Sequence, residues 1–506
     1  MKKFFSTLIF IALSVTTMLP MWAASLPNIV IVLADDLGYG DVQCYNPERG
    51  KIPTPHIDRL ALQGVRFTDA HSSSGVCSPS RYTLLTGRYH WRTRLQTWIV
   101  PLWGKPLIAP DRMTIGTLAK QHGYRTAAIG KWHLGWDWPI TPEQKKWLGA
   151  GMKADAVTEQ HRLAWKEIFS QPILDGPTTR GFDYYFGTDV PNWPPYCFIE
   201  NDRTVGIPNE LLSPDKLLGR EWLASIQGPA LPDWKFESIL PALTEHAERF
   251  IIESAAKSEP FLLYMPLTSP HTPIAPNEEW QGKSGMEHNA ARVADLIMET
   301  DAVVGRIADA LEKTGQTENT LFLFTSDNGF AGYVGAKELE SQGHFPSGPF
   351  RGYKSDVFEG GHRIPFVVRW PKVVKPKTVC HQLIHHADFM ATLADILGSQ
   401  LPDNAGEDSF SLLPLLKSED KPIREHAVSC ANNGTPGVRM GAWKLIVEQK
   451  PQLYNLADDL GETADLAERH PDRVEKMFTL YEKLVSDGRS TPGPVQRNDV
   501  DVPQRR

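Results

Sequence analysis

The chain has 506 residues, of which 41% are hydrophobic and 22% are charged, and its formal net charge at pH 7 is -7. A chain of this length can bury a large core, and this composition is typical of a globular protein. The acidic balance provides no broad basic surface, so nucleic acid is excluded as an expected partner.

The first 25 residues have the pattern of a secretory signal peptide. Lys2 and Lys3 precede an apolar run over residues 4–19, and small residues follow at positions 23–25. The run is short for a membrane helix, which requires about 20 apolar residues, and no later stretch supplies about 18 without interruption. We expect residues 1–25 to be cleaved and the mature protein to be periplasmic or extracellular, without stable membrane insertion. A retained anchor is the alternative.

Five cysteines are spread widely along the chain, and an odd number leaves at least one without an internal partner. Their spacing resembles neither a dense disulfide scaffold nor a zinc site. If one of them serves chemistry, the other four can form disulfides or remain free, and the sequence leaves this open. The cysteines are Cys44, Cys77, Cys197, Cys380 and Cys430.

Short apolar runs predict strands that are buried on both faces, as in a parallel sheet. In chain order these runs cover residues 28–34, 126–129, 261–266 and 321–325, and the run over 126–129 is the weakest. Each run is followed at once by polar residues and turn formers. Ligands of open α/β sheets bind at the carboxyl ends of the strands, so the pattern directs these polar clusters at one crevice.

Helix-like stretches over residues 114–122 and 290–313 alternate with the strands, which predicts an α/β fold with a large mixed, mostly parallel sheet between helices. Residues 140–240 are rich in Trp, Pro and Gly and are expected to form long loops over the crevice. We divide the chain into a signal peptide (1–25), a catalytic α/β domain (26–414), a C-terminal α+β subdomain with a short antiparallel sheet and one helix (415–490), and a flexible tail (491–506).

Two pairs of adjacent oxygen-bearing side chains each come directly after a predicted strand: Asp35 with Asp36, and Asp327 with Asn328. Neighbouring carboxylates repel one another unless a cation neutralises them, and oxygen-only ligands favour Ca²⁺ or Mg²⁺ over Zn²⁺. The alternative is that each pair caps a following turn or helix. Two pairs in the same position relative to a strand favour a cation site.

The most specific pattern is the segment CSPSRYTLLTGR over residues 77–88. Pro79 suits the first turn of a helix, which places Cys77 at a helix N-terminus. Such an end stabilises anions, and Arg81 adds a fixed positive charge. The alternative is a structural cysteine ahead of an ordinary helix.

This segment matches the sulfatase signature Cys-x-Pro-Ser-Arg with its trailing Leu-x-Thr-Gly-Arg, and other blocks accompany it in family order. These blocks are ADDLGYGD (34–41), TPHID (54–58), GKWHLG (130–135), SDNG (326–329), Gly352 and Lys354, EGGHRIP (359–365) and LYNL (453–456). Over most of its length the chain therefore resembles the type I, formylglycine-dependent sulfatases of the alkaline phosphatase superfamily. Its early part is similar to the galactose and N-acetylgalactosamine sulfatases among the bacterial carbohydrate sulfatases.

The resemblance implies that a formylglycine-generating enzyme converts Cys77 to formylglycine (3-oxoalanine), whose hydrated form attacks sulfur. It also implies one Ca²⁺ in the site, with the modified Cys77 as a further ligand. The residues that would hold this ion are Asp35, Asp36, Asp327 and Asn328.

Five further residues take catalytic roles from the same resemblance. Arg81 would steady the formylglycine, and Lys131 and Lys354 would neutralise charge on the sulfuryl group. His133 would take a proton from the hydrated formylglycine, and His271 would protonate the leaving alcohol. Taken singly, such lysines are usually surface residues, and such histidines usually bond loop backbone.

Other polar and aromatic residues were weighed for a functional role. His385, His386 and Asp388 resemble a metal site, but residues 388–397 have the pattern of a helix that begins at Asp388, so capping is the preferred interpretation. Further residues could contact substrate without anything in the sequence that proves it: Arg92, Arg94, Trp98, Trp103, Trp193 and His344.

The sequence leaves three functional alternatives beside a carbohydrate sulfatase that acts on a mucin, a glycosaminoglycan or an algal glycan. One is an arylsulfatase for small aryl sulfates. Another is a phosphodiesterase or phosphonate hydrolase of the same superfamily, although such relatives carry Asp-His where this chain has Asp327-Asn328. The last is a non-catalytic glycan-binding relative, which would have lost site residues that are all present here.

Overall fold

The computed structural model describes residues 26–149, 156–213 and 225–504. The predicted signal peptide lies outside these ranges. None of the helices in the described part of the chain combines the length and the apolar character needed to cross a membrane.

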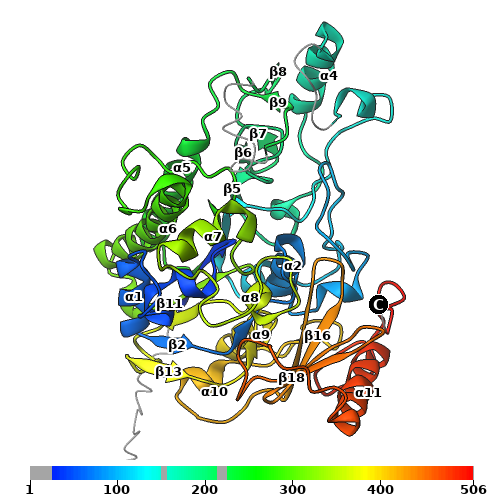
Figure 1. Cartoon of the computed structure of the whole chain (residues 1–506). Coiled ribbons are helices and arrows are strands. Elements are labelled where there is room, and N and C mark those ends of the chain that lie inside the picture. The colour runs from blue at the N-terminus through cyan, green and yellow to red at the C-terminus, as the bar shows by residue number, and fades with distance from the viewer. Residues whose placement is uncertain (1–25, 150–155, 214–224, 505–506) are drawn as a thin grey trace, which may run out of the picture.

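The predicted strands form the middle of a ten-stranded mixed sheet (Figure 1). Along the sheet the strands are β13 (Thr378–Cys380), β2 (Val65–Phe67), β12 (Phe366–Arg369), β11 (Thr320–Ser326), β1 (Asn28–Asp35), β10 (Phe261–Pro270), β4 (Arg125–Lys131), β5 (Tyr184–Thr188), β6 (Ile199–Glu200) and β7 (Arg203–Thr204). The five central strands, from β11 to β5, run parallel to one another. The mixed, mostly parallel sheet predicted from the sequence is confirmed.

The central strand β1 is buried on both faces, and its alternating side chains separate two apolar cores. Val30 and Val32 face one core, whereas Ile29 and Ile31 face the other. This alternation is what a strand must have when helices cover both faces of its sheet.

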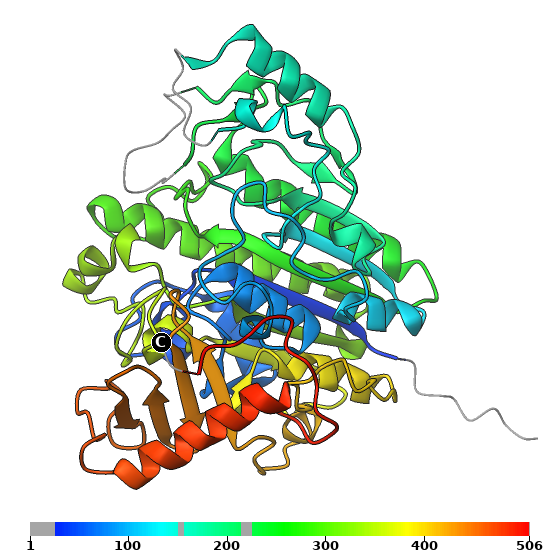
Figure 2. The same cartoon turned by 90° about the vertical axis from the view of Figure 1, so that its right-hand side faces the viewer.

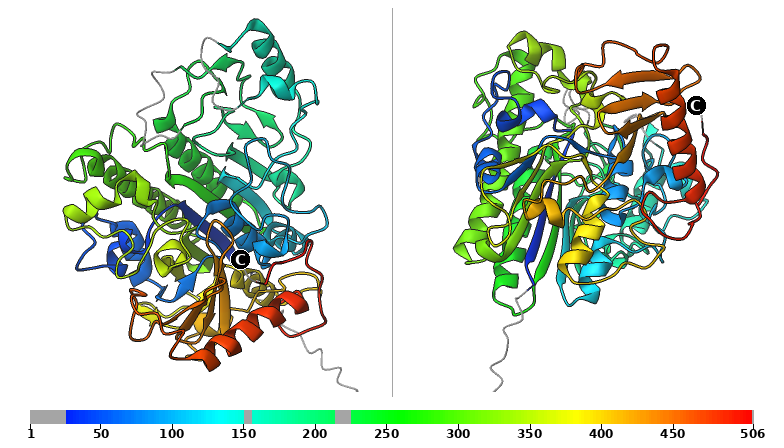
Figure 3. Two further views of the ribbon diagram at one scale, coloured as in Figure 1. Left: turned by 45° about the vertical axis from the view of Figure 1, so that its right-hand side comes forward. Right: turned by 90° about the horizontal axis from the view of Figure 1, so that it is seen from below.

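Helices cover both faces of the sheet, as the view from below shows (Figure 3). On one side lie α1 (Pro55–Leu62), α5 (Ile239–Ala255), α6 (His288–Lys313) and α7 (Ala336–Ser341). On the other side lie α2 (Cys77–Thr86), α3 (Ile115–Gln121), α9 (Asp388–Ile396) and α10 (Leu413–Leu416). The chain is thus a three-layer α/β structure.

The segment over residues 140–240 is more structured than predicted. It contains α4 (Glu159–Phe169), the sheet strands β5, β6 and β7, and the small pair β8 (Glu210–Leu211) and β9 (Pro229–Ala230), at the top of Figure 1. The expectation of loops alone was therefore wrong. Strands of two residues have no detectable periodicity, and β5 extends the sheet because β4 offers it a free edge.

The C-terminal part forms the predicted antiparallel sheet with one helix packed across it (Figure 2). The elements are β15 (His426–Cys430), β16 (Pro436–Met440), β17 (Trp443–Ile446), β18 (Gln452–Asn455) and α11 (Pro471–Asp487). Met477 and Leu484 of α11 enter a core with Val438 and Leu445 of the sheet. Smaller elements elsewhere are β3 (Ala70–His71), β14 (Ile384–His385) and α8 (Glu359–His362).

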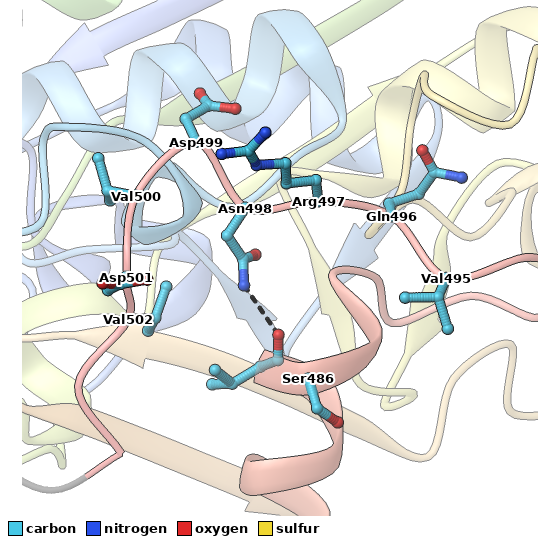
Figure 4. Close-up of a pocket in the computed structure, with 10 residues that line it drawn as sticks. Ser486, Val495, Gln496, Arg497, Asn498, Asp499, Val500, Asp501 and Val502 are labelled. Atoms are coloured by element: carbon cyan, nitrogen blue, oxygen red, sulfur yellow. Dashed lines mark hydrogen bonds between the residues drawn. The ribbon is translucent and has the colours of Figure 1, made fainter.

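The last residues return along α11 to the catalytic domain. Asn498 donates from Nδ2 to the Val485 carbonyl oxygen at 2.8 Å (Figure 4), and Asp499 pairs with the buried Arg88 at 3.0 Å. A cavity of about 830 Å³ between this tail and α11 is lined by Val485, Ser486 and residues 495–502, and none of the predicted site residues line it. The contacts fix where the tail lies, whereas its flexibility stays a prediction.

A buried ionic network joins the C-terminal sheet to the large domain. Glu359 accepts hydrogen bonds from Lys444 Nζ at 3.0 Å and from Arg363 Nη1 at 2.7 Å. Lys444 also forms an ion pair with Glu462 at 2.8 Å. Burial alone would raise the pKa of Glu359, but Lys444 first, and His71 and the arginines with it, hold that pKa well below its usual range.

The same network explains a group that resembles a metal site. His71, Glu359 and His362 each offer a ligand atom within 4.8 Å of the others. However, Lys444 Nζ lies 3.0 Å from Glu359 Oε1 and 3.2 Å from His362 Nε2, so a protein cation already supplies the positive charge. The group serves to hold the two sheets together.

We predict that Lys444→Met lowers the free energy of unfolding by about 3 kcal/mol, because it leaves the buried carboxylates Glu359 and Glu462 without their shared cation. Denaturant unfolding measures this loss. Lys450→Met removes an exposed lysine from the adjacent turn and should stay within about 0.5 kcal/mol of the parent. Equal stability of the two variants would contradict the network's role.

Candidate active site

The carboxyl ends of four adjacent parallel strands bring the predicted residues together. Asp35 ends β1 and Lys131 ends β4, while Asp327 directly follows β11 and His271 directly follows β10. The register keeps these ends level, because Ala34 of β1 lies opposite Ser326 of β11. The structure therefore brings together the polar residues that follow these strands.

Cys77 enters this crevice as the first residue of α2, as the sequence predicted. All ten residues of the helix are buried, and Pro79 stands at its third position. Val76 precedes the helix in an extended conformation, and no side chain caps the first turn. No side chain therefore caps the backbone N–H groups of the first turn. These N–H groups favour negative charge beside Cys77.

Arg81, one turn along α2, ties three strand ends together. Its Nη2 and Nε donate to Asp327 Oδ2 at 2.8 and 3.1 Å, and Nη2 lies 3.3 Å from Asp35 Oδ1. Its Nη1 donates to the Lys131 carbonyl oxygen at 2.9 Å. A planar guanidinium is the side chain that can make these contacts simultaneously.

Lysines balance the two adjacent aspartates. Lys131 Nζ donates to Asp35 Oδ2 and Lys354 Nζ donates to Asp36 Oδ2, both at 2.7 Å. Burial would raise the pKa of Asp35, but Lys131 and the other nearby cations hold it well below its usual range. Burial and the charge of Asp35 together raise the pKa of Asp327 to about 7.

The donor set fits a hard divalent cation. Ligand atoms of Asp35, Asp36, Cys77 and His271 all lie within 4.8 Å of one another. The buried Asn328 Oδ1 accepts no hydrogen bond, and the only partner of Asp35 Oδ1 among the described residues is the ion pair with Arg81 at 3.3 Å. Buried oxygens without hydrogen-bond donors are suited to a bound cation, and carboxylate and amide oxygens favour Ca²⁺ or Mg²⁺.

Asn328 and Asp36 also contact each other directly. Asn328 Nδ2 donates to Asp36 Oδ1 at 2.8 Å, while the backbone N–H of Asp36 donates to Asp327 Oδ1 at 3.1 Å. Asp36 has a positive φ of 67°, which is rare for a residue other than glycine. This turn directs the carboxylate into the crevice rather than along the sheet.

The two predicted catalytic histidines lie on either side of the acidic cluster. His133 follows Lys131, has a φ of 51°, and is buried with no hydrogen-bond partner for either ring nitrogen. Burial, followed by the charges of Lys131 and Arg81, lowers its pKa well below the usual value, which leaves a neutral ring able to accept a proton.

His271 is fixed by its other nitrogen. Nδ1 donates to the Thr272 carbonyl oxygen at 2.6 Å, which turns Nε2 toward Asp36 Oδ2 at 3.8 Å. Burial, with the charges of Lys131 and Lys354, lowers the pKa of His271 to about 4. The ring thus presents Nε2 to the same space as the carboxylates.

The structure adds residues to the site that the sequence did not identify. Asp189 directly follows β5, next to β4, and its Oδ1 is buried without a partner. Burial raises its pKa to about 6, whereas the Trp136 indole and the His133 backbone N–H favour its ionised form. The sequence analysis did not predict strand β5, so it did not identify Asp189 as a residue at a strand end.

Two aromatic residues lie beside the charged groups. The Trp193 ring stands 5.5 Å from the His133 ring, edge to face, which supports the earlier suggestion that Trp193 lies where substrate binds. Tyr333 is 55% exposed and is close enough to Lys354 and Asp36 for their charges to shift its pKa. No sequence pattern indicated Tyr333.

Other candidate substrate contacts lie outside the site. Arg92 is buried and pairs with Asp408 at 2.8 Å, and His344 is buried against Asp41 at 2.8 Å. Asp388 begins α9 and accepts hydrogen bonds from the backbone N–H groups of His385 and Phe410. It therefore anchors local structure, in line with the capping role preferred over a metal site in the sequence analysis. These groups are buried and paired within the fold.

Comparisons with known proteins agree with this geometry. The sequence model of the sulfatase family matches residues 27–399, and that of the C-terminal part of N-sulphoglucosamine sulphohydrolase matches residues 353–485. An N-acetylgalactosamine-6-O-sulfatase of Bacteroides thetaiotaomicron is 33% identical over 90% of this chain and 93% of its own length. Arylsulfatase A of Bos taurus is 30% identical over 94% of this chain and 91% of its own length.

Solved structures share the fold. One, from work on the metabolism of multiple glycosaminoglycans by Bacteroides thetaiotaomicron, has a TM-score of 0.76 and 31% identity, and the match covers 91% of this chain and 99% of that chain. Another, which holds k-i-k-neocarrahexaose, has a TM-score of 0.69 and 25% identity, and the match covers 93% of this chain and 95% of that one.

We predict that Arg81→Lys lowers the free energy of unfolding by about 3 kcal/mol. An ammonium group cannot donate at the same time to the Asp327 carboxylate and to the Lys131 carbonyl oxygen in the geometry of the guanidinium. Urea unfolding of parent and variant measures the difference. The control Arg59→Lys changes an exposed pair with Asp309 and should shift stability by less than about 0.5 kcal/mol. A similarly small effect at both positions would show that Arg81 does not hold the strand ends together.

Proposed function

Because the chain belongs to the sulfatase family, we propose that this sulfuric ester hydrolase removes sulfate from a carbohydrate, using Cys77 converted to formylglycine and one bound Ca²⁺. The observation that carries the proposal is the position of Cys77, at the start of a buried helix and within 4.8 Å of ligand atoms of Asp35 and Asp36. Family membership favours this reaction over phosphodiester or phosphonate hydrolysis.

The environment of Cys77 does not suit an unmodified thiol as the nucleophile. Burial raises the pKa of the unmodified thiol to about 12, although Lys131 and Lys354 oppose that rise. A thiol with this pKa stays protonated at neutral pH and lacks the thiolate that cysteine nucleophiles require. Cys77 is therefore better suited as the precursor of another nucleophile than as a nucleophile itself.

Residues of this chain can hold the cation and handle the sulfate charge. Asp35, Asp36, Asp327 and Asn328 would hold Ca²⁺, which polarises sulfate oxygens when bound, while the formylglycine supplies the attacking oxygen. The cation would balance the carboxylates, and Lys131 and Lys354, which each lie 2.7 Å from a carboxylate oxygen, would then be available to balance the negative charge of the sulfate. Arg81 holds Asp327 in place throughout.

The net reaction is hydrolysis of the S–O bond of the ester. The alcohol oxygen leaves with a proton, and water supplies the hydroxyl that remains on sulfate. His271 Nε2 faces the carboxylate cluster, and the negative charge of a bound sulfate would raise the low pKa of this ring so that Nε2 can carry the proton that goes to the alcohol oxygen. His133 is neutral and unpartnered, and is placed to accept a proton from the nucleophile's side.

The proposed substrate is a galactose- or N-acetylgalactosamine-type sugar of a mucin, glycosaminoglycan or algal glycan. The 33% identical relative is an N-acetylgalactosamine-6-O-sulfatase, and aromatic residues such as Trp193 and Tyr333 beside the site suit a sugar ring. The N-terminal sequence pattern supports export to meet such a glycan. A second candidate is a small aryl sulfate, favoured by the 30% identity to arylsulfatase A.

We predict that protein co-expressed with a formylglycine-generating enzyme releases sulfate from a 6-sulfated galactose or N-acetylgalactosamine, and that Cys77→Ala abolishes this release because no nucleophile remains. Ion chromatography of free sulfate measures it across a panel with an aryl sulfate included. Cys197→Ala removes another buried cysteine away from the cluster and should retain activity. Release from the aryl sulfate alone would favour the second candidate, and equal release by Cys77→Ala would overturn the mechanism.

We predict that Ca²⁺ at about 100 times its dissociation constant stabilises the protein by about 2.7 kcal/mol, because the ion binds only the folded carboxylate cluster. Thermal unfolding with Ca²⁺ or with a chelator measures the shift. Asp35→Asn should lose most of the shift, whereas the exposed control Asp309→Asn should keep it. An unchanged shift in Asp35→Asn would place the ion elsewhere.

A further inference from the structure

A cavity of about 290 Å³ lies beside the loop that carries His133. Its walls include Trp103, Trp136, Trp138 and Leu148, and its rim carries Lys105 and Lys145. Trp136 and Trp138 are buried behind it, whereas both lysines are exposed. The cavity thus combines an aromatic wall with positive charge at the opening.

The aromatic wall is held rigidly. Trp103 donates from Nε1 to the Leu148 carbonyl oxygen at 3.0 Å, and its ring meets the Trp138 ring edge to face at 5.9 Å. Trp136 packs against Tyr185 at 5.2 Å, and it lies so close to Gly176 that a Cβ there would come within 2.5 Å of the indole. A preformed wall reduces the ordering cost of binding a ligand.

The same backbone links this wall to the catalytic loop. Trp136 follows His133 by three residues, and the backbone N–H of Trp136 donates to the Gly104 carbonyl oxygen at 3.0 Å. The N–H of Leu107 donates to the Leu134 carbonyl oxygen at 2.8 Å. The segment that forms the cavity wall and the segment that carries His133 are therefore hydrogen-bonded to each other.

The charges at the rim indicate which ligand fits. Lys105 forms an ion pair with Asp137, whereas Lys145 forms no ion pair with any other residue in the described ranges. The whole chain carries a net charge of -7, so a pair of lysines at an aromatic cavity is a local departure from its acidic surface. A purely apolar ligand would not use the lysines, and a free inorganic anion would not use the indoles.

We propose that this cavity binds a negatively charged sugar unit of the glycan, distinct from the unit whose sulfate is removed. The sugar ring packs on the exposed part of Trp103, and its sulfate or carboxylate group meets Lys145. This inference rests on the carbohydrate substrate proposed above. It makes the enzyme prefer an oligosaccharide over the corresponding monosaccharide.

Kinetics on two substrates test the cavity. For Lys145→Glu the KM of a chondroitin 6-sulfate tetrasaccharide should rise about fivefold, while that of N-acetylgalactosamine 6-sulfate stays unchanged. Trp103→Ala should raise the tetrasaccharide KM about tenfold through the lost stacking. An unsulfated chondroitin tetrasaccharide as competitor shows whether the carboxylate alone suffices.

Each variant has a matched control in the chain. Lys146→Glu changes the neighbouring exposed lysine, which lies over the Trp147 ring and outside the cavity wall. Trp280→Ala removes a partly exposed tryptophan that lies outside the lining of the cavity. Both controls should leave both KM values unchanged. Equal effects of Lys145→Glu and Lys146→Glu would overturn the proposal.

Binding separates a failure of the cavity from a failure of the proposed function. Calorimetry should show that the Cys77→Ala protein binds the tetrasaccharide and that adding Lys145→Glu weakens this binding about fivefold. If the parent hydrolyses neither substrate but Lys145→Glu still weakens binding, the cavity proposal is supported and the proposed substrate is wrong. If the parent is active but binding is undetectable or insensitive to Lys145→Glu, the cavity proposal is wrong.

Discussion

Three carboxylates buried together at the ends of two neighbouring strands set the main constraint on this structure. Asp35, Asp36 and Asp327 repel one another in a region without water to screen them, so the fold must bring positive charge to the same point. Arg81 and Lys131 do so from α2 and β4, and Lys354 does so from a separate loop. The elements that carry these cations cannot move independently of the sheet.

Much of the remaining architecture follows from this constraint. Helix α2 must lie inside the molecule to deliver both Arg81 and Cys77, so its outer side also needs cover. Helices α3 and α9 provide part of that cover. Strand β15 of the C-terminal sheet bonds to the segment before α2, where the Cys430 N–H donates to the Ser73 carbonyl oxygen at 2.9 Å, and the ionic network around Glu359 joins this sheet to the large domain. The tail contributes at the other end of the helix, where Arg88 pairs with Asp499. Charges buried by this packing are paired, as the low dielectric requires.

The sequence predicted the site well where a strand end or a specific motif places a residue. Asp35 and Asp327 follow long apolar runs, and parallel strands place such ends side by side, so their proximity could be inferred without coordinates. Cys77 could be placed at a helix start because Pro79 restricts the local conformation. The fold class followed from the same alternation of strands and helices.

Residues whose role depends on distant packing could not be predicted in this way. Asp189 reaches the site because β5 pairs with β4, and the β5 sequence YYFGT is not the unbroken apolar run that predicts a buried strand. His271 was predicted as an acid, but its approach to Asp36 depends on the turn after β10. Conversely, Arg92 and His344 looked functional because they are polar, yet each is buried against a carboxylate that the sequence does not place nearby.

The arrangement is consistent with a site whose chemistry is supplied by modification of one residue rather than by an activated thiol. The most direct measurement uses preparations made with graded amounts of a formylglycine-generating enzyme. Mass spectrometry gives the fraction of Cys77 that is converted, and sulfate release gives the activity of the same samples. Our account predicts activity proportional to the converted fraction, with none in unconverted protein. Activity that is independent of this fraction would contradict it.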